Sequence, residues 1–178
     1  SNIQDSAQIN TLLEELRLGL QNNSLNSSEA YYENITALFK GQWAPISEEV
    51  TTFLETVETI EGAIYPPMVK TNIKTLSSTK QLAHFFKEWI FDNLFVADNV
   101  LTVEGLSFKE TEVFPGDIAE NSQLVTRTIE IDGTYNESPG YHINNDETVL
   151  RPTGTYAGPG QLVTLKVPND ILDKGWLV

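Results

Sequence analysis

The stretch STKQLAHFFKEWIFDNLF, residues 78–95, has the most pronounced helical pattern in the chain. Its apolar side chains recur at three- and four-residue steps, which places them on one face of a helix. The face is unusually wide and consists of Leu82, Phe85, Phe86, Trp89, Ile90, Leu94 and Phe95. Because a face of this width must be buried on more than one side, the pattern predicts that this helix packs against several others.

Three earlier stretches show the same periodicity. The first runs from a Ser6 cap to about Leu20, the second covers 28–40, and the third covers 47–64. A serine at a helix start satisfies unpaired backbone N–H groups, and Pro66-Pro67 ends the third stretch because proline lacks the amide donor. Four amphipathic helices with short connectors pack most simply as a bundle. We therefore predict a four-helix bundle-like domain over residues 1–97, with helix order and crossing angles left open.

The second half of the chain alternates polar and apolar residues as β-strands do. Residues 101–103, 106–108, 123–132 and 161–167 fit this pattern, and Gly- and Pro-containing turn signals separate them. The predicted fold class is α+β: the helical bundle is followed by an antiparallel β-sandwich over 98–178. We expect the sandwich to be incomplete and to leave an open sheet edge, through which two copies would form a dimer.

Composition narrows the classes of partner. The 178 residues carry a net charge of −14, which repels nucleic acid, and no apolar run is long enough for membrane insertion. Cysteine is absent, so thiolate chemistry and Cys-based metal sites are excluded.

Residues that could perform chemistry are scattered along the sequence. His84 and Glu88 have helical spacing, but two ligands do not make a metal site, and we interpret them and His142 as structural. The acidic turn 144–147 lacks the spacing of a known calcium loop, and no pair of carboxylates stands out as glycosidase-like. The sequence therefore predicts a non-catalytic chain with no metal site and no cofactor of its own.

One segment is specific. Residues 151–168, RPTGTYAGPGQLVTLKVP, closely resemble the start of the M60-like (enhancin-like, mucin-degrading) metallopeptidase region, where a similar turn leads into a strand that ends in proline. The turn residues that match are Arg151, Thr153, Gly154, Tyr156, Gly158 and Gly160. In that arrangement Gly154 and Gly160 would supply backbone freedom, and Tyr156 would insert into the sandwich core.

The resemblance implies a secreted zinc endopeptidase that cleaves mucin-type O-glycosylated proteins with a His-Glu-x-x-His motif. That motif is absent from these residues, so no catalytic residue transfers. We expect an extracellular, cell-surface or periplasmic accessory region of a bacterial virulence-type hydrolase, which positions the zinc-containing catalytic region or engages its glycoprotein substrate. The alternative is a stand-alone carbohydrate- or protein-binding module, with Trp43 and Trp176 as glycan contacts. An independent glycosidase-like enzyme is a third hypothesis.

Overall fold

The structure, a computed structural model, describes residues 2–96, 99, 104–132 and 152–175. Four helices form the N-terminal half: α1 (Asn2–Gln21), α2 (Glu29–Leu38), α3 (Ser47–Glu61) and α4 (Ser78–Asn93). The described residues also contain short 3₁₀ helices, which are η1 (Ile73–Thr75) between α3 and α4, and η3 (Lys109–Glu112) and η4 (Asn169–Ile171) later in the chain. Each of the four predicted helices is present, but α1 begins at Asn2, so Ser6 lies within the helix and the prediction that it caps the helix is wrong.

Helix α4 begins and ends where its sequence directs. The Ser77 side chain accepts a hydrogen bond from the Lys80 N–H at 3.1 Å, and the Leu94 N–H closes the last turn on the Ile90 carbonyl. The helix packs against both α2 and α3, while α1 packs against the same two helices from the other side. The prediction that α4 is buried on more than one side is therefore confirmed.

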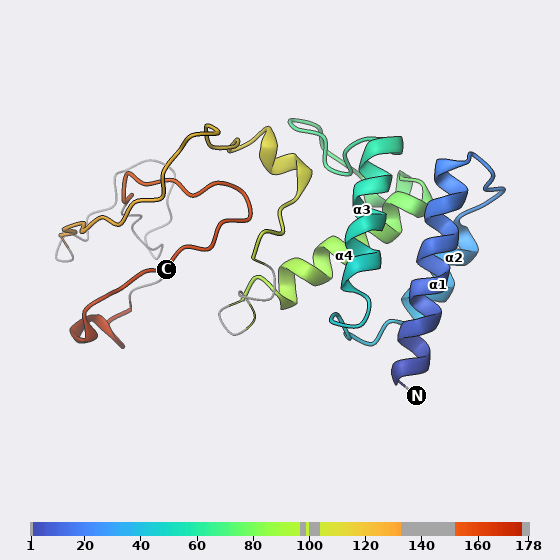
Figure 1. Cartoon of the computed structure of the whole chain (residues 1–178), viewed down its shortest axis with the longest axis horizontal. Helices are drawn as coiled ribbons and strands as arrows, with labels where there is room; N and C mark the ends of the chain where they lie inside the picture. The colour runs from blue at the N-terminus through green and yellow to red at the C-terminus, as the bar shows by residue number, and fades with distance from the viewer. Residues whose placement is uncertain (1, 97–98, 100–103, 133–151, 176–178) are drawn as a thin grey trace.

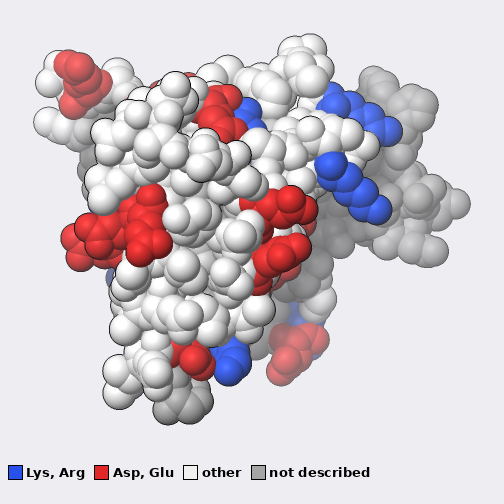
Figure 2. Space-filling model, turned by 90° about the vertical axis from the view of Figure 1, so that its right-hand side faces the viewer, with Lys and Arg blue, Asp and Glu red and all other residues white. Residues whose placement is uncertain are grey.

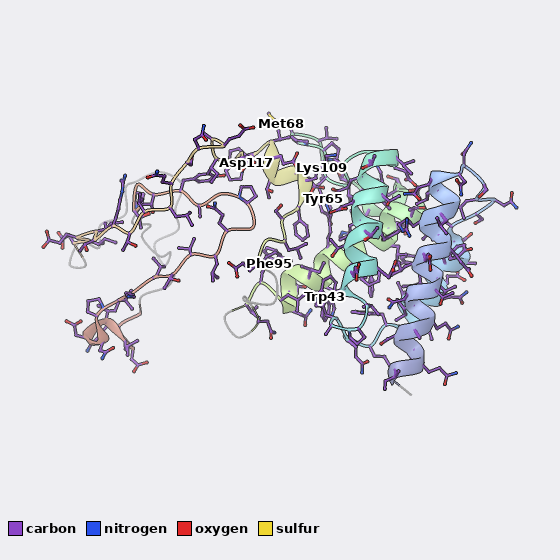
Figure 3. All side chains as sticks on the ribbon, viewed as in Figure 1. Trp43, Tyr65, Met68, Phe95, Lys109 and Asp117 are labelled. Carbon is purple, nitrogen blue, oxygen red and sulfur yellow. The ribbon has the colours of Figure 1, made fainter. Side chains whose placement is uncertain are left out.

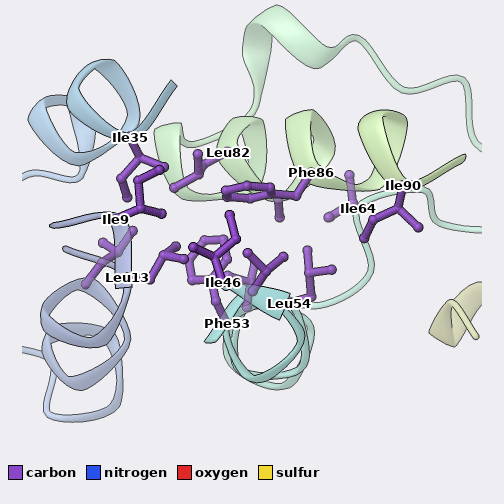
Figure 4. Packing of buried hydrophobic residues seen from close by; sticks show 14 of the residues in the cluster. Ile9, Leu13, Ile35, Ile46, Phe53, Leu54, Ile64, Leu82, Phe86 and Ile90 are labelled. Atoms are coloured by element: carbon purple, nitrogen blue, oxygen red, sulfur yellow. The ribbon is translucent and has the colours of Figure 1, made fainter. Parts of the chain in front are cut away.

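The core lies between the four helices (Figure 4). Phe53 of α3 and Phe86 of α4 are its largest fully buried side chains. Aliphatic residues from every helix surround them: Ile9, Leu13, Leu16, Ile35, Ile46, Val50, Leu54, Val57, Ile64, Leu82, Ala83, Ile90 and Leu94. Acidic side chains gather in several places on the bundle face seen in Figure 2.

The prediction of an antiparallel β-sandwich over 98–178 is wrong. The described part of the chain contains helices and no strand (Figure 1). A strand exists only where a neighbouring backbone supplies a ladder of hydrogen bonds, and segments 123–132 and 161–167 share none. Their apolar side chains, such as Leu124 and Val163, remain exposed. Alternation therefore occurs here without the pairing and burial that would make a sheet.

Two further predictions change with the sandwich. The dimer was expected through an open sheet edge, and the described ranges contain no sheet to provide one. Residues 106–108 form no strand but lead the chain back to the bundle, where Leu106 and Phe108 pack against its core. The predicted strand 101–103 and most of the turn signals after residue 132 lie outside the described residues.

Among the helices that are described, none is both long and apolar enough to cross a membrane.

Candidate functional site

The turn that resembles the M60-like region is held by the preceding segment, 105–118. Gly160 accepts a hydrogen bond from the Gly105 N–H at 2.8 Å, and the Tyr156 hydroxyl donates to the Gly116 carbonyl. Gly158 is buried against Ile118, whose side chain would lie only 3.2 Å from a Cβ at position 158. Three contacts thus fasten residues 156–160 to the same stretch of chain.

Two of these turn positions favour glycine for different physical reasons. Gly154 and Gly160 both have positive φ, 67° and 73°, which side chains rarely tolerate. A Cβ on Gly154 would meet open space, whereas a Cβ on Gly160 would lie 3.0 Å from the backbone of Gly105. Gly160 therefore serves both the turn and the close approach of two backbones.

The remaining turn residues are peripheral. Thr153 is exposed, and its hydroxyl accepts from the Thr155 N–H at 3.3 Å. Tyr156 was predicted to insert into a sandwich core, but it is 53% exposed and reaches Gly116 along the surface. That prediction is wrong because no second layer covers the turn in the described ranges. Arg151 lies outside the described residues.

A buried cluster of charges joins segment 105–118 to the bundle. Lys87 of α4 is 2% exposed, and its ammonium binds the carboxylates of Glu58 on α3 and Glu110 on η3. The distances to the two Glu110 oxygens are 2.8 and 3.1 Å. The ammonium also lies 5.0 Å from the centre of the Phe108 ring. One cation therefore neutralises carboxylates that come from opposite halves of the chain.

Glu110 connects segment 105–118 to the helical bundle. Besides Lys87, its Oε1 accepts from the Tyr65 N–H at 3.3 Å. Partial burial acts to raise the pKa of Glu110, but the hydrogen bonds and charge of Lys87, together with backbone N–H groups, lower that pKa below its ordinary value of 4.5. Glu110 therefore stays ionised at neutral pH, which suits an ion-pair anchor and not a general acid.

A second group of polar side chains adjoins this cluster. The Tyr65 hydroxyl is hydrogen-bonded to His84 Nδ1, and His84 Nε2 lies 3.3 Å from Glu88 Oε2. Burial, with the nearby carboxylates of Glu88 and Glu110, raises the pKa of the Tyr65 phenol to about 12. Tyr65 is thus a poor nucleophile at neutral pH. His84 and Glu88 thus lie side by side on α4, and the described ranges contain no group of three His, Cys, Asp or Glu residues that could hold a metal ion.

An apolar hollow of about 410 Å³ lies where α4 ends. Phe91 and Phe95 form one wall, Leu106 and Phe108 a second, and Pro159 and Leu162 of the turn region a third. Figure 3 shows Phe95 between the bundle and the C-terminal half. The hollow therefore adjoins both the family-like turn and the anchored segment.

Trp43 is less available for a ligand than the sequence suggests. It is half-buried and stacks on Trp89, with 5.9 Å between ring centres and 25° between ring planes. One face of the indole is therefore covered by the protein itself. Trp176, His142 and the acidic turn 144–147 lie outside the described residues.

Sequence reasoning missed the cluster around Lys87. A signal was present, because Lys87 falls four residues after Ala83 and three before Ile90, both on the apolar face of α4. Glu58 likewise falls four residues after Leu54, which is buried on α3. The contribution of Glu110 had no local signal, since it depends on how the chain returns after residue 104.

Comparisons of the chain with protein-family models, curated proteins and solved structures found no match.

Proposed function

We propose that this chain is a non-catalytic accessory region of an M60-like zinc metallopeptidase that acts on mucin-type O-glycosylated proteins, and that its role is to position the region that follows the 151–168 turn. Residues 151–168 carry the resemblance. The supporting observation is a continuous path of contacts from the bundle, through Lys87 and Glu110, to Gly105 and the turn.

The path is suited to positioning because each contact has little freedom. Lys87 is enclosed by the helices, and Glu110 receives two hydrogen bonds from its ammonium and one from the Tyr65 backbone. At the other end, Gly105 and Gly160 approach too closely to admit a side chain. A catalytic region joined to the turn would inherit its orientation from the rigid helices, and misplacement by about 1 Å can cost roughly a hundredfold in rate.

Zinc is included in the proposed function solely because residues 151–168 resemble the M60-like family. In the described ranges, His, Cys, Asp and Glu do not come together in groups of three that could hold an ion. The zinc ligands and the reaction would therefore lie outside these residues. This chain would have a supporting role.

The test uses the natural polypeptide that contains these 178 residues. We expect it to contain a His-Glu-x-x-His motif, to bind zinc and to cleave an O-glycosylated mucin. A natural polypeptide that lacks the motif, or whose zinc-loaded form cleaves no O-glycosylated protein, would refute the family function.

The positioning role is tested separately with Gly160→Ala and the matched control Gly154→Ala. Both place a methyl group at positive φ, but only Gly160→Ala forces the two backbones apart. We expect Gly160→Ala to lower cleavage about tenfold or more, with unchanged zinc content, and Gly154→Ala to have a much smaller effect. Equal activity in the two variants would argue against positioning.

A second function, a carbohydrate- or protein-binding module, is favoured by the aromatic walls of the hollow at Phe91, Phe95 and Phe108. Apolar pockets with a few polar groups are common binding sites. A glycan array probed with this chain and with Phe91→Ser distinguishes the two functions. Glycan binding that Phe91→Ser abolishes would support the module.

A further inference from the structure

The loop between α3 and η1 displays an apolar side chain at its tip. Pro66-Pro67-Met68-Val69 forms a β-turn in which the Val69 N–H bonds to the Pro66 carbonyl at 3.3 Å. Met68 is fully exposed, and Val69 is also largely exposed. Figure 3 shows Met68 on a loop that projects from the bundle. A monomer gains nothing by holding these two side chains in water.

The backbone at Met68 is also unfavourable for its residue type. Its φ is +62°, in the left-handed region, at a turn position where glycine or asparagine is preferred. Methionine brings neither the freedom of glycine nor the local hydrogen bonds of asparagine. Residues held in sparsely populated backbone conformations cluster at functional sites, and the strained residue here also carries an exposed apolar side chain.

The loop itself carries positive charge, although two carboxylates lie at its ends, where Glu110 accepts from the Tyr65 N–H and Glu61 accepts from the Ser77 hydroxyl. Between Gly62 and Lys87 the sequence has no Asp or Glu, although the whole chain has a net charge of −14. Lys70 and Lys74 are exposed and form no ion pair with any described residue, and the Lys80 ammonium donates to the Ala63 carbonyl at 3.2 Å. Lys70, Lys74 and Lys80 thus have no carboxylate partner in the described ranges.

We infer that the 66–74 loop is a docking site for an acidic segment of a partner protein, with Met68 and Val69 covered by an apolar residue of that segment and Lys70 and Lys74 paired with its carboxylates. The charge of the loop identifies the partner as acidic, and the exposed tip requires an apolar contact. This inference stands apart from the proposed function, because neither the family-like turn nor its anchor takes part.

An anionic membrane is the competing partner, and the observations disfavour it. Two apolar side chains provide little area for insertion, and stable membrane attachment normally takes two signals. A membrane presents many charges at once to a chain with a net charge of −14, whereas a short segment interacts with the loop within a Debye length of about 8 Å. A peptide can therefore use the local positive charge without meeting the acidic surface elsewhere.

A random peptide library displayed on phage, selected against the immobilised chain, tests the inference. We expect enriched peptides in which Asp or Glu flanks an aromatic or aliphatic residue. The Kd of a synthetic copy would then be measured against variants. Met68→Gly removes the side chain and suits the positive φ, so we expect unchanged or higher thermal stability with about tenfold weaker binding.

The charge contribution is measured with Lys70→Gln/Lys74→Gln, which should weaken binding roughly fivefold and reduce its dependence on salt. Lys166→Gln/Lys174→Gln is the matched control, because it makes the same change in net charge on exposed residues outside the loop. Three results would overturn the inference: no acidic enrichment, full binding by Met68→Gly, or equal loss in the control. Binding to phosphatidylserine vesicles without peptide binding would also overturn it, in favour of a membrane.

Discussion

At the scale of the residue, Lys87 is the side chain whose loss should affect folding stability most. It is buried among hydrophobic residues of α4 and α3, and two carboxylates from different parts of the chain compensate its charge. An ion pair in such a place contributes less to stability than its short contacts suggest, because desolvation offsets the attraction. Losing one member is costly, because the charges that remain have no counterpart.

Lys87→Met should therefore destabilise the protein strongly. Leaving Glu58 and Glu110 without their cation should reduce the free energy of unfolding by about 3–5 kcal/mol, measured by urea denaturation. The triple variant Lys87→Met/Glu58→Leu/Glu110→Leu removes all three charges and should recover most of that loss. If the single variant is as stable as the parent protein, the cluster has no anchoring role.

The lowered pKa of Glu110 predicts a pH dependence of stability. Because the folded-state pKa lies below the ordinary value of 4.5, Glu110 contributes stability above that pH, and this contribution disappears as pH falls through the folded-state pKa. The difference in unfolding free energy between the parent protein and Glu110→Gln should be constant above pH 4.5 and shrink below it. A difference that grows as pH falls would contradict this.

The raised pKa of Tyr65 predicts a change in folding stability at alkaline pH. Its raised pKa, about 12, means that the folded protein favours the protonated phenol, so this stabilisation is present below pH 10 and decreases as pH rises toward 12. Ultraviolet titration of the folded parent protein should show a phenolate ionisation step near pH 12 that belongs to Tyr65. Tyr65→Phe should remove the delayed step.

At the scale of the element, the 156–160 turn depends on the segment against which it lies. Gly105 donates to Gly160, and Gly158 packs on Ile118, so turn and segment form one unit without a sheet. The unit is joined to the bundle through η3, because Glu110 lies in that 3₁₀ helix and Phe108 packs just before it. Within the described residues, two short irregular stretches therefore lie where a sandwich was predicted.

Hydrogen exchange can measure that attachment directly. The Gly105 amide should exchange slowly in the parent protein because it donates to Gly160 at 2.8 Å. In Gly160→Ala the added Cβ would press on the Gly105 backbone, so we expect exchange about tenfold faster or more, with little change in Gly154→Ala. Equal protection in all three proteins would mean that the contact is not formed in solution.

At the scale of the whole molecule, the two halves differ in how much they bury. The hydrophobic core is built from the four helices and the loops between them, and among the described later residues Leu106 and Phe108 pack against it. By contrast, segments 123–132 and 161–167 leave most of their apolar side chains in water. Most of the hydrophobic burial in the described residues therefore comes from the helical half.

A fragment of residues 1–96 should consequently retain the helical fold. We expect a helical circular dichroism spectrum, from α1–α4, and a cooperative thermal transition. The Tm should be lower than that of the whole chain, because Lys87 loses its contacts with Glu110 and Phe108. A melting midpoint equal to that of the whole chain would show that η3 contributes nothing to the bundle. A fragment without cooperative unfolding would show that the bundle depends on later residues.

What the sequence determined by itself is the helical half. A helix makes its hydrogen bonds within one segment, so periodicity and local signals such as the prolines after α3 were sufficient to predict all four helices. Burial of α4 on more than one side also followed from the width of its apolar face.

Only the tertiary structure decided the rest. Whether 123–132 and 161–167 pair is a property of two distant segments together, and alternation within each could not reveal it. In the same way, Lys87, Glu58 and Glu110 are separated in sequence and meet only because the chain returns to the bundle at η3. Local hydrogen bonds can be inferred from neighbours in sequence, but long-range contacts depend on where the packed core leaves room for the returning chain.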